Sequence, residues 1–190
     1  MNESSMRAAG AAQEDWLKRY YFARAGFSIA WVGAALGLAP GFPGLAAALL
    51  ILYPAWDALA NLVDGQRSGG IAANRSQAIN AAVSLAVTGA IASTLPDMHR
   101  VLAVFGAWAI LSGLLQLTTA LKRWKTNGAQ WAMILSGAQS ALAGAVFIFQ
   151  ASAPAEPTVA TVAGYAGFGA FYFLVSALSL SLRATRRKAV

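Results

Sequence analysis

The sequence has no cysteine, a single histidine and few charged residues. Only 11% of its 190 residues are Asp, Glu, Lys or Arg, whereas soluble domains carry about 25%. The absence of cysteine excludes disulfide frameworks, thiolate metal sites and cysteine nucleophiles. One imidazole cannot supply the several histidines of most metal centres. We therefore expect neither a metal site nor a cofactor.

Apolar residues are what the chain has in excess. They make up 58% of the sequence and the mean hydropathy is +0.56, against about 45–50% apolar residues in ordinary soluble domains. A chain with so few polar residues cannot cover a compact fold with a surface that water tolerates. The composition predicts a polytopic membrane protein, whose first partner is the lipid bilayer.

Six continuous apolar stretches of about 20 residues run through the sequence. Lipid offers no hydrogen bonds to the backbone, so we expect each stretch to be a helix. Turn-forming residues separate the stretches, as in a polar, glycine-rich loop expected from Asp64 to Gly70. The predicted spans are 21–39, 42–63, 77–95, 98–121, 129–150 and 158–182.

Both ends of the chain are polar. Residues 1–20 are expected to form a cytoplasmic tail or a helix lying at the membrane interface, and residues 183–190 a basic cytoplasmic tail. Of the 14 Lys and Arg residues, all except Arg100 fall on one side of the predicted spans. The positive-inside rule therefore places both termini in the cytoplasm. Because these basic residues suit lipid headgroups, we expect no nucleic-acid partner.

Similar segments recur along the chain. Phe105-Gly-Ala-Trp108 and Phe168-Gly-Ala-Phe171 lie 63 residues apart. Small residues also recur in pairs seven residues apart, at Gly26 and Gly33, Ala82 and Gly89, and Gly137 and Gly144. Within a bundle at 21–182, these patterns predict three helical hairpins, at 21–63, 77–121 and 129–182. A hairpin returns to its starting side, so we expect an all-α bundle of six transmembrane helices as three parallel repeats around a pseudo-threefold axis.

Two segments carry a resemblance to a known family. Tyr53–Asn61 (YPAWDALAN) and Gly137–Gly144 (GAQSALAG) resemble segments of the HdeD-like family, bacterial short-repeat membrane proteins whose name-giving member is linked to acid resistance. The resemblance extends over residues 20–182. It implies a bacterial inner-membrane protein with a stress-related role, and it assigns no chemistry to individual residues.

Asp57 is an acidic residue deep within a predicted span. An ionisable group at such a depth costs about 2.5–3.5 kcal/mol unless it is paired or hydrated. Pro54, three residues earlier, frees the carbonyl of Leu50 and favours a kink. We expect Asp57 to be buried among helices and paired with Arg24, which lies at a similar height on the first span. Asn61, one turn away, is expected to share its hydrogen-bond network.

Two interpretations of a buried Asp57 are considered, besides a third in which Asp57 is an interfacial residue that lies less deep than the predicted span places it. In one, its ion pair fixes the packing of helices; in the other, Asp57 is a proton or cation relay, or the floor of a polar cavity. The amides Asn80, Gln116 and Gln139 are expected to join neighbouring helices by hydrogen bonds, or to line a cavity. A continuous water-accessible path to Asp57 would distinguish the two interpretations.

The leading functional prediction is a non-enzymatic membrane protein of the HdeD-like type. One alternative is a small channel or transporter that uses Asp57 as its intramembrane coupling site. A second alternative is an assembly factor or a subunit of a larger membrane complex. Further copies of the chain or other membrane proteins are the expected partners. We expect no enzyme, because one histidine and one buried acid supply neither a metal-ligand set nor a nucleophile–base pair.

Overall fold

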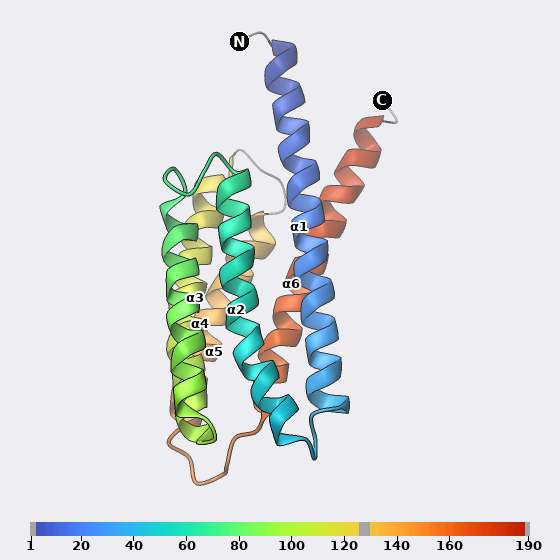
Figure 1. The fold of residues 1–190 in the computed structure, drawn as a ribbon. Coiled ribbons are helices and arrows are strands. Elements are labelled where there is room, and N and C mark those ends of the chain that lie inside the picture. The colour runs from blue at the N-terminus through green and yellow to red at the C-terminus, as the bar shows by residue number, and fades with distance from the viewer. Residues whose placement is uncertain (1–2, 126–129, 189–190) are drawn as a thin grey trace.

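The computed structural model describes residues 3–125 and 130–188, which form a bundle of six α-helices. Successive helices run in opposite directions, and both termini lie at the same end of the bundle (Figure 1). The all-helical architecture predicted from the apolar stretches is confirmed. The helices are α1 (Glu3–Gly37), α2 (Pro43–Arg67), α3 (Arg75–Thr94), α4 (Met98–Arg123), α5 (Gln130–Gln150) and α6 (Val159–Lys188).

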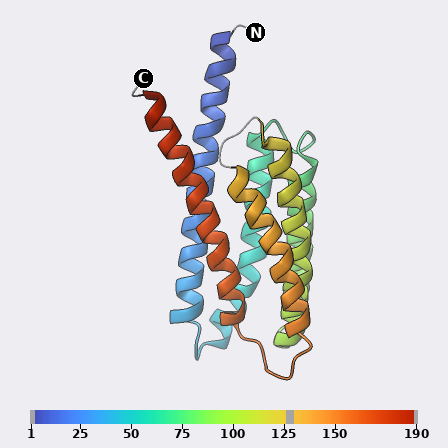
Figure 2. The ribbon, with the colours of Figure 1, turned by 180° about the vertical axis from the view of Figure 1, so that it is seen from behind.

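Five of the helices, α2 to α6, are long and apolar enough to cross a membrane, which indicates a multi-pass membrane protein. The helix containing the predicted first span, α1, is not among these five. Its first half is polar, and Arg24 with two tyrosines lowers the hydropathy of the rest. The helix still runs the whole length of the bundle beside its neighbours (Figures 1 and 2).

The helices extend beyond the predicted spans. Residues 3–20, expected as a tail or a separate interfacial helix, are continuous with the rest of α1, and residues 183–188 continue α6. The predicted loop from Asp64 to Gly70 is also shorter, because α2 ends only at Arg67. An apolar pattern marks where a helix meets lipid, whereas Ala, Glu, Lys and Arg prolong the helix outside it. As a result α1 and α6 project past the other helices (Figure 2).

The six helices form a closed ring in which each contacts the next and α6 contacts α1. The most extensive contacts are between α4 and α5, between α1 and α6, and between α2 and α3. The contacts of α1 with α2 and of α5 with α6 are sparse. The bundle therefore consists of a four-helix group, α2 to α5, and a two-helix group, α1 and α6. We call the two sparse contacts the seam.

Glycines bring the backbones of α4 and α5 together. Gly113 lies against Gly137, and Gly106 lies against Gly144. A Cβ atom added to Gly113 would lie 2.6 Å from the carbonyl oxygen of Gly137, closer than real Cβ atoms approach a neighbour. Small residues allow this approach, and van der Waals contact then holds the helices together in lipid. We call these four residues the glycine interface.

The matching glycines of α1 lie in a different environment. Gly26 and Gly33 are exposed, and a Cβ atom added to either would meet nothing within 4 Å. The seven-residue spacing shared with Gly137 and Gly144 therefore does not mark equivalent packing positions. The same spacing can face a neighbouring helix or the surroundings, depending on how the helix is rotated about its axis.

An apolar core fills the end of the bundle away from the termini. It draws on the last turns of α1, α3 and α5 and on the first turns of α2, α4 and α6. Burial of these side chains leaves that end tightly packed. The apolar core consists of Trp31, Ala35, Ala39, Leu49, Leu50, Tyr53, Ile91, Val101, Leu102, Phe105, Trp108, Phe147, Val159, Val162, Ala163 and Ala166.

Candidate functional site

A polar cavity of about 110 Å³ lies between the helices in the half of the bundle nearer the termini. All six helices contribute to its wall. Toward the apolar core it is bounded by Tyr53, Trp108 and Tyr165, whose rings meet edge to face. A cavity of this size has room for several water molecules or a small ligand.

The structure brings every polar residue singled out from the sequence to the wall of this one cavity. The six residues come from five helices, so the sequence of any two neighbouring spans does not show that they lie together. They are Arg24, Asp57, Asn61, Asn80, Gln116 and Gln139.

Arg24 and Asp57 form the ion pair expected from the sequence. Arg24 Nη2 lies 2.5 Å from Asp57 Oδ1, and the two side chains are 13% and 7% exposed. Arg24 Nη1 also donates to the hydroxyl of Tyr20 at 3.1 Å, and the guanidinium lies 4.5 Å from the ring centroid of Phe173. The cation is therefore held by α1 and α6 and the carboxylate by α2, so the pair crosses the seam.

The second carboxylate oxygen of Asp57 accepts three further hydrogen bonds. Asn61 Nδ2 donates at 3.1 Å, Asn80 Nδ2 at 3.4 Å and Ser84 Oγ at 2.8 Å. Ser84 in turn accepts a hydrogen bond from Trp108 Nε1 at 2.9 Å. Asp57 therefore accepts four hydrogen bonds in all, about as many as a carboxylate has lone-pair positions, although three of them share Oδ2. Its network joins α1, α2, α3 and α4.

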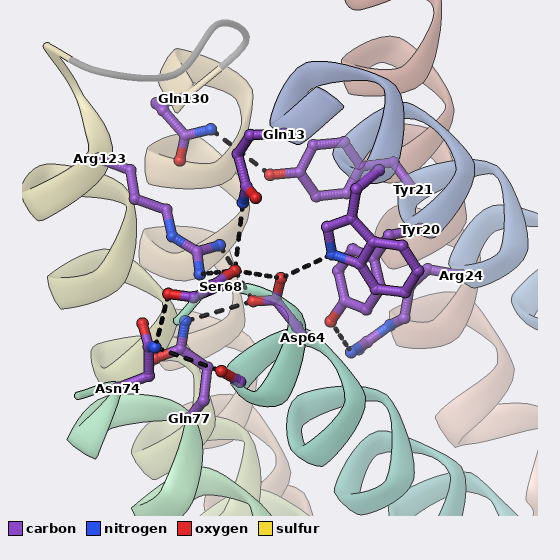
Figure 3. A network of polar contacts seen from close by, with 12 residues as sticks. Gln13, Tyr20, Tyr21, Arg24, Asp64, Ser68, Asn74, Gln77, Arg123 and Gln130 are labelled. Atoms are coloured by element: carbon purple, nitrogen blue, oxygen red, sulfur yellow. Dashed lines mark hydrogen bonds and ion pairs between the residues drawn. The ribbon is translucent and has the colours of Figure 1, made fainter. Parts of the chain in front are cut away.

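Asp64 forms a second buried carboxylate site, which the sequence analysis assigned to a loop (Figure 3). Its side chain is 5% exposed, and Oδ2 lies 3.0 Å from Arg123 Nη1. Gln77 Nε2 donates to the same oxygen at 3.2 Å. Ser68 Oγ and Trp16 Nε1 donate to Oδ1 at 3.2 and 3.5 Å. Two buried acids, rather than the single one expected, therefore line the cavity.

The sequence did contain a signal for this second site. Asp57, Asn61 and Asp64 stand at positions i, i+4 and i+7, which places them on one face of a helix. A span that ends at residue 63 obscures the pattern, because Asp64 then falls at the start of the predicted loop. Arg123, one of the basic residues expected beside lipid headgroups, likewise has a side chain that is only 14% exposed.

The turn between α2 and α3 positions Ser68 beside Asp64. Asn74 Nδ2 donates to the carbonyl oxygens of Gly65, Ser68 and Gly70, at 3.3, 2.9 and 2.9 Å. Gly69 and Gly70 adopt φ angles of 104° and 95°, which glycine reaches without strain. The glycine-rich segment thus closes a tight turn rather than a long loop.

The two glutamines join helices while lining the cavity. Gln116 Nε2 donates to the carbonyl oxygen of Met133 at 3.1 Å, linking α4 to α5. Gln139 Oε1 accepts from the hydroxyl of Tyr172 at 2.7 Å, linking α5 to α6. Each therefore fits both interpretations offered for the amides. Such bonds between membrane helices contribute about 0.6 kcal/mol on average.

Comparison with known proteins gives a match to a family model. Residues 81–149 match the family described as a short repeat of unknown function (DUF308), the family to which HdeD belongs. This segment is similar to a short-repeat protein. It covers most of α3, all of α4 and most of α5, and so includes the glycine interface. No curated protein and no solved structure matches the chain.

Proposed function

We propose that this chain is a small transporter, which binds a small polar solute in the central cavity and uses Asp57 as its coupling residue. The cavity is the observation that carries the proposal. It is polar, it reaches Asp57, and all six helices contribute to it. The apolar core closes the opposite end. A cavity closed at one end suits a transporter better than an open channel.

The two helix groups supply the moving part in this proposal. Transporters commonly expose a central site alternately by rocking one rigid bundle against another. Here the sparse contacts of the seam separate the α1–α6 group from the four-helix group, and the cavity lies between them. The Arg24–Asp57 pair crosses the seam. In this proposal the ion pair holds the two helix groups together, and its separation couples solute binding to motion of α1 and α6.

The proposed location is the bacterial inner membrane with both termini in the cytoplasm. The two ends of the chain, the α2–α3 connection, the last turn of α4 and the first turn of α5 lie at one end of the bundle (Figure 1). Of the 14 basic residues, all except Arg100 lie in the half of the chain's predicted topology that faces this end. We expect alkaline phosphatase fused after residue 156 to be active and the enzyme fused after residue 125 to be inactive. The reverse activities would contradict this orientation.

We further propose that the bundle is built from three repeats, as in a protein of the HdeD-like type with a stress-related role. The extensive contacts, α2–α3, α4–α5 and α6–α1, alternate around the ring with weaker ones, as a threefold repetition requires. The hairpins should overlay by successive rotations of about 120°. The proposed protein is non-enzymatic, and its partners besides the bilayer are further copies of itself or other membrane proteins.

Labelling of single cysteines tests the transporter proposal. The chain has no cysteine, so each variant needs only one substitution. Ser112 lines the cavity, whereas Ala35 lies in the apolar core. We expect a membrane-impermeant thiol reagent to label Ser112→Cys from the side of the termini and to leave Ala35→Cys unlabelled. Equal labelling of the two variants, or none of Ser112→Cys, would contradict the proposal, and labelling of Ser112→Cys from both sides at once would indicate a channel.

A further inference from the structure

The charges that line the cavity are balanced and hydrogen-bonded. Arg24 pairs with Asp57, and Arg123 pairs with Asp64. Asp57 accepts hydrogen bonds from four residues, and so does Asp64 through its two oxygens. Each carboxylate thus accepts about as many hydrogen bonds as a carboxylate has lone-pair positions, and each already has a guanidinium as its counter-charge. A ligand with a net charge would add an uncompensated charge among apolar helices, which is costly.

One buried acceptor on the cavity wall has no partner among the described residues. Asn80 is 7% exposed, and its Oδ1 atom has no hydrogen-bond donor there. The orientation of the amide is fixed, because Nδ2 is the atom that donates to Asp57. A buried carbonyl oxygen without a donor costs about 1–3 kcal/mol. A molecule that donates a hydrogen bond to Asn80 Oδ1 would remove this cost.

The hydrogen-bond donors of Arg24 lie on the opposite side of Asp57 from Asn80. A guanidinium has five N–H groups, and among the described residues Arg24 uses two of them, for Tyr20 and Asp57. Arg24 lines the cavity and can therefore donate to a ligand without leaving its carboxylate. An acceptor from α3 and donors from α1 thus flank one carboxylate.

Aromatic rings make up much of the remaining wall. Trp108 belongs to α4, and Tyr165, Phe168 and Tyr172 belong to α6. Small-molecule sites in proteins typically combine such apolar and aromatic walls with a few convergent polar groups. The wall therefore suits a molecule with an apolar C–H surface and one end that forms hydrogen bonds.

We propose that the cavity binds a small molecule without net charge that carries both a hydrogen-bond donor and an acceptor, such as a primary amide or a polyol. The donor bonds Asn80 Oδ1, and the acceptor receives a hydrogen bond from Arg24. This inference rests on the proposed transporter function and names the class of its solute. Hydroxyl and amide groups share the required chemistry.

Four probes of similar size separate the classes. The purified full chain in lipid nanodiscs is titrated with acetamide, glycerol, sodium acetate and ethylammonium chloride, and the readouts are the unfolding temperature and tryptophan fluorescence. We expect a saturable response to acetamide or glycerol, and whichever responds identifies the amide or polyol chemistry. We expect no saturable response to the two charged probes. A cosolvent that is merely excluded from the protein surface also changes the unfolding temperature. That change does not saturate, so a saturable response indicates binding.

Substitution of Asn80 locates the binding site. Asn80→Ala should weaken the apparent affinity for the responding probe about tenfold, the change expected for the loss of one hydrogen bond. Thr88→Val is the matched control, because Thr88 Oγ1 donates within α3 to the carbonyl oxygen of Ser84. It should change the affinity less than twofold. Should Asn80→Ala fail to fold, Ala143→Leu adds apolar volume on the cavity wall and should abolish the response.

The outcomes separate this inference from the proposed function. Saturable responses to acetate or ethylammonium, and not to the neutral probes, would overturn the solute class and leave the transporter proposal standing. No response to any probe, together with labelling of Ser112→Cys, would also overturn the class alone. No response together with absent labelling would overturn both. Unchanged affinity in both Asn80→Ala and Ala143→Leu would overturn the assigned site.

Discussion

The glycine interface and the seam hold helices together in opposite ways. Between α4 and α5, backbone lies on backbone, and Gly113 leaves no space for a side chain. Across the seam, apolar side chains pack in the half away from the termini. In the other half the helices are joined by polar side chains around a cavity, among them the Arg24–Asp57 ion pair. Close packing in lipid needs small residues, whereas a solute site needs polar groups that keep helices apart. Under the proposed transporter function, the glycine interface belongs to the rigid part and the seam to the part that opens.

The largest effect is expected from a side chain introduced into the glycine interface. Gly113→Leu places a Cβ atom 2.6 Å from the carbonyl oxygen of Gly137, so the two backbones must separate. We expect no folded, monodisperse protein in size-exclusion chromatography. Gly33→Leu is the control, because its Cβ atom would meet nothing within 4 Å, and it should elute as the unsubstituted chain does. Similar elution of both variants would show that the interface is not closely packed.

A smaller effect is expected from breaking the ion pair of the seam. Asp57→Ala or Arg24→Ala alone leaves a charge buried without its partner, which typically costs about 3–5 kcal/mol. The double variant removes both charges and should lose less stability than either single variant. Thermal unfolding in detergent measures all three. Losses that add up in the double variant would mean that the two charges do not stabilise each other.

The smallest effect is expected from a neutral hydrogen bond across the seam. Tyr172→Phe removes the donor to Gln139 and should cost about 0.6 kcal/mol, the usual value for a hydrogen bond between membrane helices. Thr118→Val is the comparison, since Thr118 Oγ1 donates to Leu114 within its own helix. Thermal unfolding should rank Tyr172→Phe as slightly less stable. A loss as large as that of Asp57→Ala would mean that the ion pair does not dominate the seam.

Local features of the fold were predictable from the sequence. Apolar stretches located the six helices, and the cost of a charge in lipid led to the pairing of Asp57 with Arg24. Both inferences depend only on depth along a helix. The spacing of Asp57, Asn61 and Asp64 also carried information, which was missed because the end of α2 was placed too early.

The arrangement of the helices in space was not predictable in the same way. An apolar pattern does not fix the rotation of a helix, so Gly26 and Gly137 looked alike although one is exposed and the other packed. The pairing of α1 with α6 joins the two ends of the chain, and no local spacing encodes such a contact. The cavity depends on the arrangement of all six helices in the ring, so the sequence alone does not predict it.

Distances between spin labels test the central claim, that α1 and α6 move relative to the four-helix group. Because the chain has no cysteine, labels can be attached at Phe22→Cys and Ile79→Cys across the seam, and at Ile79→Cys and Leu121→Cys within the four-helix group, all at exposed positions. We expect Asp57→Asn, which weakens the ion pair with Arg24, to broaden or shift the distance distribution across the seam. The distribution within the four-helix group should stay narrow and unchanged. Two distributions that both remain unchanged, or that shift together, would contradict the account.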